Sequence, residues 1–508
     1  MKNQTFPPVS FADWTSAAEA SLKGNPLSKL KTKTAEGIEL KPLYTKEDRK
    51  TVLSLPGEKP FTRGFQPDPA FPKTDIKMGV DPISAGAAAG IFPADSVFSE
   101  IHKQETITIN TVPYHLAGAN AVQELALALS EAAYLIGMAE NKNEAAVKCV
   151  IHFAAGPVFF TELAKIRAFR TLWSTFMSAY NLSEHAKPKL SVETSDAMLS
   201  VLDPHVNILR IGSAAFSAVI GNIDYLTVKP FDEVAGSTTE LSKRIACNIS
   251  RLLKHEALLD KVMDPGGGSY YIEALTEEIG RRAWDVFADM EEAGGIKQAL
   301  LSGVIQKDIA AVKSKKEQHI ATRRQQMIGT NIYANPEEQI AHLKNEKTKP
   351  TFKGTPIEPL EQKRMAEPFE ALRLASMQLR QTEQSVAAGL ICLGELKKHK
   401  PRADYVAGVL AVAGIETIRS ESCKTIEEAI QFMERHPLPY YCICGPDELY
   451  EQVGEEFGLQ FKEAAGGAVV DIAGTWNMAG IDGRIAAGDD IVKKLTDMLL
   501  LYKGGGVK

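Results

Sequence analysis

The feature that most constrains this chain is a regular alternation of short β-branched segments with longer helical segments, which begins near residue 74. In the longer segments the apolar residues recur at spacings of three and four, which is typical of helices packed on one face. The short segments, which we expect to be strands, are 76–80, 106–112, 147–153, 190–193 and 225–228. Strands that alternate with helices predict a parallel α/β sheet with right-handed crossovers. Such a sheet is either a barrel or an open, doubly wound sheet, and the five expected strands are fewer than the eight βα units that a (β/α)₈ barrel needs.

The alternation resumes near residue 386 and continues to the end of the chain. The expected strands there are 390–393, 416–419, 440–444 and 468–472. A segment of about 120 residues is the size of one Rossmann-like (flavodoxin-like) domain. Between the two regions, the stretch 344–359 is rich in Lys, Glu and Pro, which indicates a linker. The expected organisation is an arm over 1–73, a first domain over 74–330, a linker over 331–385 and a second domain over 386–508.

The arm carries one early helix, followed by charged residues and prolines as far as Pro72. A segment this poor in apolar periodicity cannot bury enough surface to hold itself together. We therefore expect it to pack on another surface, either of this chain or of a partner.

Composition excludes several functional classes. A chain of 508 residues with 44% hydrophobic and 24% charged residues is globular and long enough for two or three domains. The net charge of -6 provides no basic surface for nucleic acid or an anionic membrane, and no apolar run approaches the length of a bilayer span. The six cysteines form no C-x-x-C pair, so a reducing, cytoplasmic location is expected.

A few residues are candidates for chemistry. Tyr114 and His115 follow an expected strand, where a histidine could donate a proton or a hydrogen bond to a thioester carbonyl. The alternative is a histidine whose ring is satisfied by loop backbone. Lys165, Arg167 and Arg170 lie along one helix with Glu162, and surface pairing of Lys165 with Glu162 is expected from their i,i+3 spacing. Arg167 or Arg170 could hold a CoA phosphate, although the pattern is not specific for this role. His399 stands among three lysines after the first strand of the second region, and a solvated loop residue is its simplest interpretation.

Several motifs, in order and over most of residues 10–335, together resemble the methylmalonyl-CoA mutase family. They are Phe11-x-x-Trp14 and Lys41-Pro42-Leu43-Tyr44-Thr45 in the arm, Tyr114-His115-x-Ala117-Gly118-Ala119, Lys165-Ile166-Arg167-Ala168-x-Arg170, Arg244-Ile245-Ala246-x-Asn248, Asp264-Pro265-x-x-Gly268-Ser269 and Ile328-Gly329-x-Asn331-x-Tyr333. The resemblance implies an isomerase family that interconverts methylmalonyl-CoA and succinyl-CoA by adenosylcobalamin radical chemistry. It also implies that CoA threads the axis of a barrel, that Tyr114 and His115 match the active-site pair, and that the second region corresponds to the cobalamin-binding domain.

The chain departs from the family pattern in two places. Where the family has Asp-x-His-x-x-Gly, this chain has Lys397-x-His399-x-x-Arg402, which replaces the orienting carboxylate with a cation and the glycine with a long side chain. We therefore expect His399 to be a vestigial cobalamin and cobalt ligand, and the chain not to bind the cofactor. In addition, about three of the eight βα units of the family barrel are lacking between the arm and residue 76, so the resemblance implies an incomplete, TIM-barrel-like first domain.

Together, the resemblance and the departures predict a small subunit of a methylmalonyl-CoA mutase. It would be structural and non-catalytic, and it would form a heterodimer with the large, catalytic subunit. Two alternatives remain: a catalytically competent acyl-CoA mutase that uses His115 and His399, and a truncated remnant without folded function.

Overall fold

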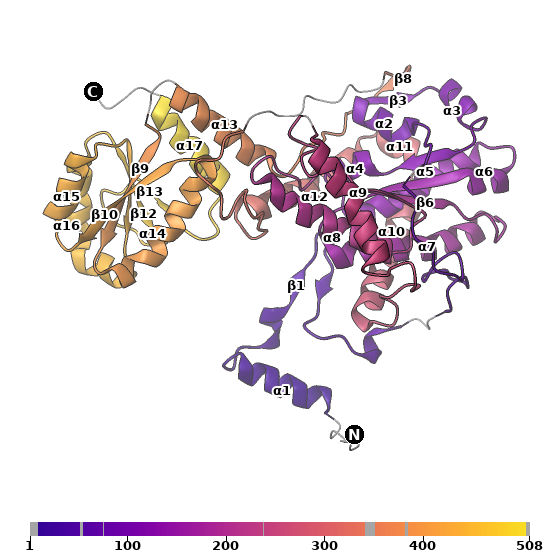
Figure 1. Cartoon of the computed structure of the whole chain (residues 1–508), viewed down its shortest axis with the longest axis horizontal. Coiled ribbons are helices and arrows are strands. Elements are labelled where there is room, and N and C mark those ends of the chain that lie inside the picture. Colours follow the sequence, from indigo (N-terminus) through magenta and orange to yellow (C-terminus); the bar gives the residue numbers. More distant parts are fainter. Residues whose placement is uncertain are drawn as a thin grey trace.

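The computed structural model describes residues 9–50, 54–74, 76–236, 238–340, 351–381 and 385–503 of the chain (Figure 1). Two parallel sheets lie at opposite ends of the long axis, each among its own helices, and the N-terminal arm projects from the first of them. Within the described residues, no helix is both long and apolar enough to cross a membrane.

The first sheet has four parallel strands in the order β4-β5-β6-β7. The strands are β4 (Ile107–Asn110), β5 (Cys149–Ala155), β6 (Lys189–Thr194) and β7 (Tyr225–Thr227). Every residue of β5 is buried, as expected for a central strand of a parallel sheet covered on both faces. These four strands confirm four of the five strands expected in this region.

Helices pack around the first sheet and supply most of its core. They are α2 (Pro82–Ala89), α3 (Asp95–Ile101), α4 (Val112–Leu116), α5 (Ala121–Gly137), α6 (Lys142–Lys148), α7 (Phe159–Ala179), α8 (Asn207–Ile220), α9 (Glu240–His255), α10 (Tyr270–Glu292), α11 (Gly295–Leu301) and α12 (Val304–Ala321). Helix α5 begins at Asn120, whose side chain accepts a hydrogen bond from the Gln123 amide in a capping box. Its leucines and alanines then pack against α7 and α10 in one continuous apolar cluster.

The expected strand at 76–80 is wrong, because this part of the chain is extended without joining a ladder. It lies instead between the two edges of the sheet. At one end the Lys73 amide donates to Asp224 O at 2.9 Å beside β7, and at the other the Asp81 carboxylate accepts from the Asn110 amide at 2.9 Å on β4. Apolar periodicity cannot distinguish extended chain held by such contacts from a paired strand.

The second sheet has five parallel strands in the order β10-β9-β11-β12-β13. They are β9 (Ala387–Leu393), β10 (Glu416–Cys423), β11 (Tyr440–Cys444), β12 (Val469–Ala473) and β13 (Gly483–Ile485). The helices of this region are α14 (Leu396–Leu410), α15 (Ile426–Arg435), α16 (Asp447–Ala465) and α17 (Ile491–Lys503). The four strands expected here are all present, whereas the short β13 was not expected.

The stretch predicted as a linker is partly structured. β8 (Gly354–Pro356) pairs antiparallel with β3 (Ile91–Pro93) of the first region, and α13 (Glu367–Gln381) packs against α17 of the second. Part of the predicted Lys/Glu/Pro stretch, residues 344–350, lies outside the described residues. One apolar cluster contains side chains from the first region, from α13 and from the second sheet, so the two regions share a core.

The arm contacts the body at several places: near its hairpin, through the buried Phe61 and Phe65, and through Lys73 beside β7. It contains α1 (Phe11–Ser21) and a hairpin of β1 (Thr32–Lys33) and β2 (Glu39–Leu40). Just after β1, Ala35 O accepts a hydrogen bond from the Asn120 side chain, and Glu36 O accepts one from Arg282. Helix α1 has no buried residue and lies well away from both sheets (Figure 1).

Candidate functional site

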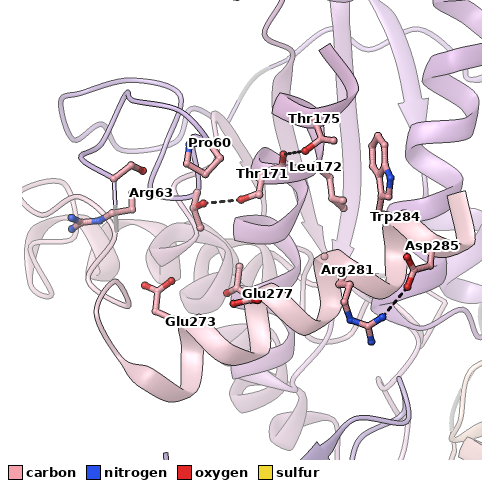
Figure 2. Close-up of a pocket in the computed structure, with 14 residues that line it drawn as sticks. Pro60, Arg63, Thr171, Leu172, Thr175, Glu273, Glu277, Arg281, Trp284 and Asp285 are labelled. Carbon is pink, nitrogen blue, oxygen red and sulfur yellow. Dashed lines mark hydrogen bonds and ion pairs between the residues drawn. The ribbon is translucent and has the colours of Figure 1, made fainter. Parts of the chain in front are cut away.

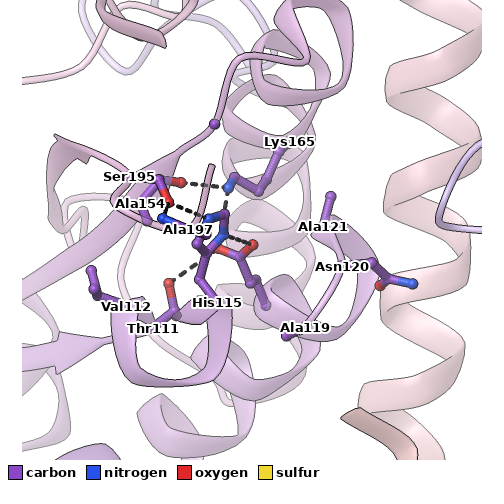
Figure 3. A network of polar contacts seen from close by, with 12 residues as sticks. Thr111, Val112, His115, Ala119, Asn120, Ala121, Ala154, Lys165, Ser195 and Ala197 are labelled. Carbon is purple, nitrogen blue, oxygen red and sulfur yellow. Dashed lines mark hydrogen bonds and ion pairs between the residues drawn. The ribbon is translucent and has the colours of Figure 1, made fainter. Parts of the chain in front are cut away.

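Four polar side chains meet at the carboxyl ends of β4, β5 and β6 (Figure 3). His115 lies on α4 after β4, Lys165 on α7 after β5, and Ser195 directly after β6, while Glu124 comes from α5. This edge of a parallel α/β sheet is where ligands bind in such folds, because the loops that follow the strands converge there. Sequence reasoning identified His115 but not Glu124 or Ser195 as its partners.

Both ring nitrogens of His115 already have side-chain partners. The Nδ1 atom lies 2.8 Å from Glu124 Oε1, and the Nε2 atom lies 2.8 Å from Ser195 Oγ. The expectation of a ring satisfied by loop backbone is therefore wrong, since side chains of two other elements hold it. No other acceptor or donor is needed to complete the ring's hydrogen bonds.

Lys165 anchors Glu124 from the opposite side. Its ammonium lies 3.1 Å from Glu124 Oε2 and 2.6 Å from Glu162 Oε2, and it donates to Ala154 O at 2.7 Å. Burial opposes ionisation of Glu124, but Lys165 and His115 together outweigh it, so the pKa of the Glu124 carboxyl lies below its ordinary value. The expected Glu162–Lys165 pair is confirmed, but it is buried and not on the surface, because Lys165 is only 1% exposed.

Tyr114 points away from this cluster, into the packing between α4 and α5. Its hydroxyl donates to Glu131 Oε1 at 2.6 Å, and the residue is fully buried. Burial, followed by the nearby Asp81 carboxyl, raises the pKa of Glu131 well above its ordinary value. Tyr114 and His115 are adjacent in sequence, yet their hydroxyl and imidazole groups contact different acids.

A second polar cluster lies beside β5 and β6 and was missed by sequence reasoning. Lys229 contacts Glu193 at 2.7 Å and Asp196 at 3.0 Å, and His152 Nε2 lies 3.4 Å from Glu193. Burial opposes ionisation of Glu193, but His152 and Lys229 together lower its pKa to about 2. The alternation of Ser191 and Glu193 on β6 was the available signal, since polar side chains at every second position share one face.

Arg167 and Arg170 are turned into the protein. The Arg167 guanidinium makes two hydrogen bonds to Asp264, at 3.0 and 3.1 Å, and one to Glu273 at 2.7 Å. Arg170 donates to the backbone oxygens of Phe61, Thr62 and Asn222. Their contacts tie α7 to the start of α10 and to the arm, and do not support the predicted role in binding a CoA phosphate.

A pocket of about 330 Å³ lies away from the strand ends, between α7, α10 and the last part of the arm (Figure 2). Leu172 and Trp284 give it apolar walls, and the paired hydroxyls of Thr62 and Thr171 lie 2.7 Å apart at its side. None of the predicted site residues lines it.

In the second sheet, the carboxyl ends of β11 and β12 are covered by a side chain from α14. Arg402 donates to Gly445 O and to Asp447 Oδ1, both at 2.6 Å, and its guanidinium lies over the ring of Tyr450 at 5.2 Å. It also lies so close to Gly474 (φ 111°) that a Cβ atom there would come within 3.0 Å of Arg402 Cζ.

His399 lies in the first turn of α14, 5% exposed, with Nδ1 3.1 Å from Gly394 O. The interpretation as a solvated loop residue is therefore wrong: the helix begins at Leu396, before the histidine, and turns its side chain inward. Within the described residues, no group of three or more His, Cys, Asp and Glu side chains could hold a metal ion.

These observations define an α/β protein with two parallel sheets, each with polar side chains gathered at the carboxyl ends of its strands. The family model for methylmalonyl-CoA mutase matches residues 95–393, which is more than half of the chain. The chain belongs to the methylmalonyl-CoA mutase family.

Several relatives are named as small subunits of this enzyme. The chain is 29% identical to the methylmalonyl-CoA mutase small subunit of Porphyromonas gingivalis, with 92% of each protein covered. It is 31% identical to that of Streptomyces virginiae over 77% of this chain and 64% of the relative. The corresponding values for Propionibacterium freudenreichii are 28%, 84% and 68%. The first alignment spans 578 positions, more than the chain's 508 residues, so this relative contains segments that the chain lacks.

Proposed function

We propose that this chain is the small, structural subunit of a methylmalonyl-CoA mutase and pairs with a larger, catalytic chain as a heterodimer. The reaction of the assembly would be the isomerisation of methylmalonyl-CoA and succinyl-CoA. We further propose that the first domain (74–330) is a TIM-like barrel shortened by about three βα units. The second (386–508) would be a Rossmann-like domain of the cobalamin-binding type, joined to the first through 331–385 and preceded by the arm 1–73.

The observation that carries this proposal is the position of Arg402. In an open parallel sheet, a cofactor binds in the crevice at the carboxyl ends of the strands. Here the guanidinium of Arg402 bonds to Gly445 O beside β11 and packs against Gly474 beside β12. The residues at these strand ends therefore do not fit adenosylcobalamin, and His399, buried in α14, is not presented to it. No step of the radical reaction is assigned to this chain.

The geometry of the first domain supports the same proposal. His115 has both nitrogens engaged by Glu124 and Ser195, and Arg167 is neutralised by two carboxylates, so neither presents a free group to an acyl-CoA. The competing function, a catalytically competent mutase, would need these groups to be open. A broken remnant is disfavoured by three clusters of buried apolar residues that extend through both domains.

The arm supports the presence of a partner. Helix α1 is capped by Ser10 and Asp13, yet it has no buried residue, and Phe11 and Trp14 stack on each other at 5.6 Å. An isolated helix of this length is marginal in water, so most of its stability would come from packing on another surface.

Co-expression with a cobalamin-binding large chain tests the proposal. The products are separated by size exclusion, and the visible corrin spectrum of each peak is recorded. We expect a one-to-one complex and no corrin absorbance for this chain alone. Stoichiometric corrin retained by the isolated chain would overturn the proposal. An Arg402→Gly variant, with Arg419→Gly on β10 as its control, tests whether Arg402 alone excludes the corrin. Corrin binding in the first variant only would assign the exclusion to Arg402, whereas no binding in either is expected if the burial of His399 also prevents it.

A further inference from the structure

The polarity of the hydrogen bonds around His115 follows from the charges that surround Glu124. Glu124 and Lys165 are 2% and 1% exposed, and their closest atoms are 3.1 Å apart. Burial raises the pKa of the Glu124 carboxyl, but Lys165 and His115, both in direct contact with it, together hold that pKa below its ordinary value, so Glu124 is ionised. An ionised carboxylate has no proton to give and can only accept. Glu124 Oε1 must therefore receive a hydrogen atom from the His115 nitrogen 2.8 Å away.

This requirement fixes the proton of a neutral His115 on Nδ1. The Nε2 atom is then a bare lone pair, and the group 2.8 Å away from it is the hydroxyl of Ser195. A hydroxyl has one hydrogen to donate and lone pairs to accept with. Since Ser195 Oγ already accepts from the Ala197 amide at 3.0 Å, its own hydrogen is available for Nε2. Every donor in this chain of contacts then meets an acceptor.

We propose that Glu124, held ionised by Lys165, and Ser195 are positioning residues that fix His115 as the neutral Nδ1-protonated tautomer, with Nε2 as a hydrogen-bond acceptor. In this state the imidazole has no N–H to offer to an acyl thioester carbonyl. A group that displaced the Ser195 hydroxyl would have to be a donor itself, such as a hydroxyl or an amide N–H. The sequence of bonds has the same polarity as in a Ser–His–acid triad. The tautomer itself follows from the contacts around His115. Only its functional consequence, that the ring offers no N–H to a thioester, rests on the proposed non-catalytic role.

The test is the tautomer of His115 in the purified full-length chain. Long-range proton–nitrogen correlation spectra distinguish a protonated from an unprotonated ring nitrogen, and the His115 signals are identified as those missing from a His115→Gln variant. In the spectrum of the neutral ring we expect a protonated Nδ1 and an unprotonated Nε2. A neutral ring protonated at Nε2 would overturn the inference.

A pair of serine variants tests the positioning role. In Ser195→Ala the Nε2 nitrogen loses its donor, and its resonance should move downfield while the tautomer is retained. Ser213→Ala removes a hydroxyl that bonds only to Pro157 O and should leave the His115 signals unchanged. An unchanged Nε2 resonance in Ser195→Ala would show that Ser195 does not donate a hydrogen bond to His115 and is not a positioning residue.

The two proposals can fail separately. A His115 protonated at Nε2 in a chain that still forms a corrin-free heterodimer would refute the tautomer but not the subunit role. A chain with the expected tautomer that retains corrin by itself would refute the subunit role but not the tautomer.

Discussion

The sequence allowed Arg167 to be a cation on the protein surface. In the structure it is instead the buried partner of two carboxylates. The guanidinium is 0% exposed and contacts the carboxylates of Asp264 and Glu273 together with the Thr276 hydroxyl. Asp264 itself has a left-handed backbone (φ 45°), which the double hydrogen bond from Arg167 helps to hold. Charges can be buried here because the cation and the carboxylates compensate one another. Removing one partner leaves a buried charge that is not fully compensated, which destabilises the fold.

Replacing Arg167 with methionine should therefore be strongly destabilising. We expect the free energy of unfolding to fall by about 3–5 kcal/mol, because Glu273 would lose its buried cation and Asp264 would keep only the partly exposed Arg63. Urea unfolding followed by far-UV circular dichroism measures the change. Arg281→Met is the control, since the exposed Arg281 pairs only with Glu278 and Asp285 on the same helix. Equal losses in the two variants would contradict this view of Arg167.

Glu131 gives a prediction about pH. Its folded-state pKa is raised by burial and then by Asp81, so ionisation is disfavoured in the folded chain relative to the unfolded one. The stability that this carboxyl contributes is complete below about its ordinary pKa of 4.5, and it is lost as pH rises through the raised value. Glu131→Gln removes the titration while keeping an acceptor for Tyr114.

The stability of Glu131→Gln should accordingly fall less than that of the wild type between pH 5 and 9. Unfolding free energies at pH 5, 7 and 9 measure the difference, and exposed Glu140→Gln serves as the control. Parallel pH profiles for Glu131→Gln and the wild type would show that the group does not titrate in this range.

For single residues, the sequence predicted which side chains are of interest better than it predicted which side chains they contact. The spacing of Glu162 and Lys165 predicted their pairing, because neighbours on a helix are set by local geometry alone. The contact of His115 with Ser195 joins residues 80 positions apart, so no local pattern reports it. The burial of Arg167 and Arg170 was missed for a related reason: their partners Asp264 and Phe61 come from distant segments.

Elements were predicted where hydrophobic pattern and burial agree. β5 and β9 are buried over their whole length, and both overlap expected strands. The expectation at 76–80 failed, since that segment is held at its ends by Lys73 and Asp81 and not by a neighbouring strand. His399 was interpreted as a loop residue, but α14 begins before it at Leu396 and contains Pro401, and a proline usually marks a helix boundary.

The start of α5 can be tested through its cap. Asn120 accepts from the Gln123 amide and also donates to Ala35 O in the arm, so Asn120→Ala removes one cap and one arm contact together. We expect a loss of about 1–2 kcal/mol in the free energy of unfolding. Asn141→Ala, which caps the shorter helix α6 without a contact to the arm, should lose less. The opposite order would mean that the arm contact contributes nothing.

In the whole molecule, the two sheets are joined by α13. Arg373 on this helix is 1% exposed, and its guanidinium donates to Asn335 O and Glu338 O on one side and to Ala411 O and Val412 O on the other. The stretch predicted as a linker thus contains a helix that packs against both regions. The sequence did not predict this packing, because α13 is rich in polar residues. Its buried face contacts residues that come from both domains and lie far apart in the chain.

Arg373→Met tests whether the domains unfold as one. Four backbone oxygens would lose their charged donor, so we expect a loss of about 2–4 kcal/mol and a splitting of the thermal transition into two. Differential scanning calorimetry measures both. Arg380→Met on the same helix is the control, because this side chain is 32% exposed and bonds to Gly414 O and Glu416. A single, unshifted transition in Arg373→Met would mean that apolar contacts alone hold the two domains together.

The segment that runs between the edges of the first sheet has a consequence for synthesis. Lys73 is made early, but the strand it pairs with begins at Tyr225. At ordinary elongation rates the ribosome needs roughly 10–30 s to add the intervening residues. Throughout that interval β4, β5 and β6 can be completed, but β7 and its contact with Lys73 cannot form. The last edge to be covered is therefore also the one most exposed to other nascent chains, and a chaperone or an early-docking subunit would act there first.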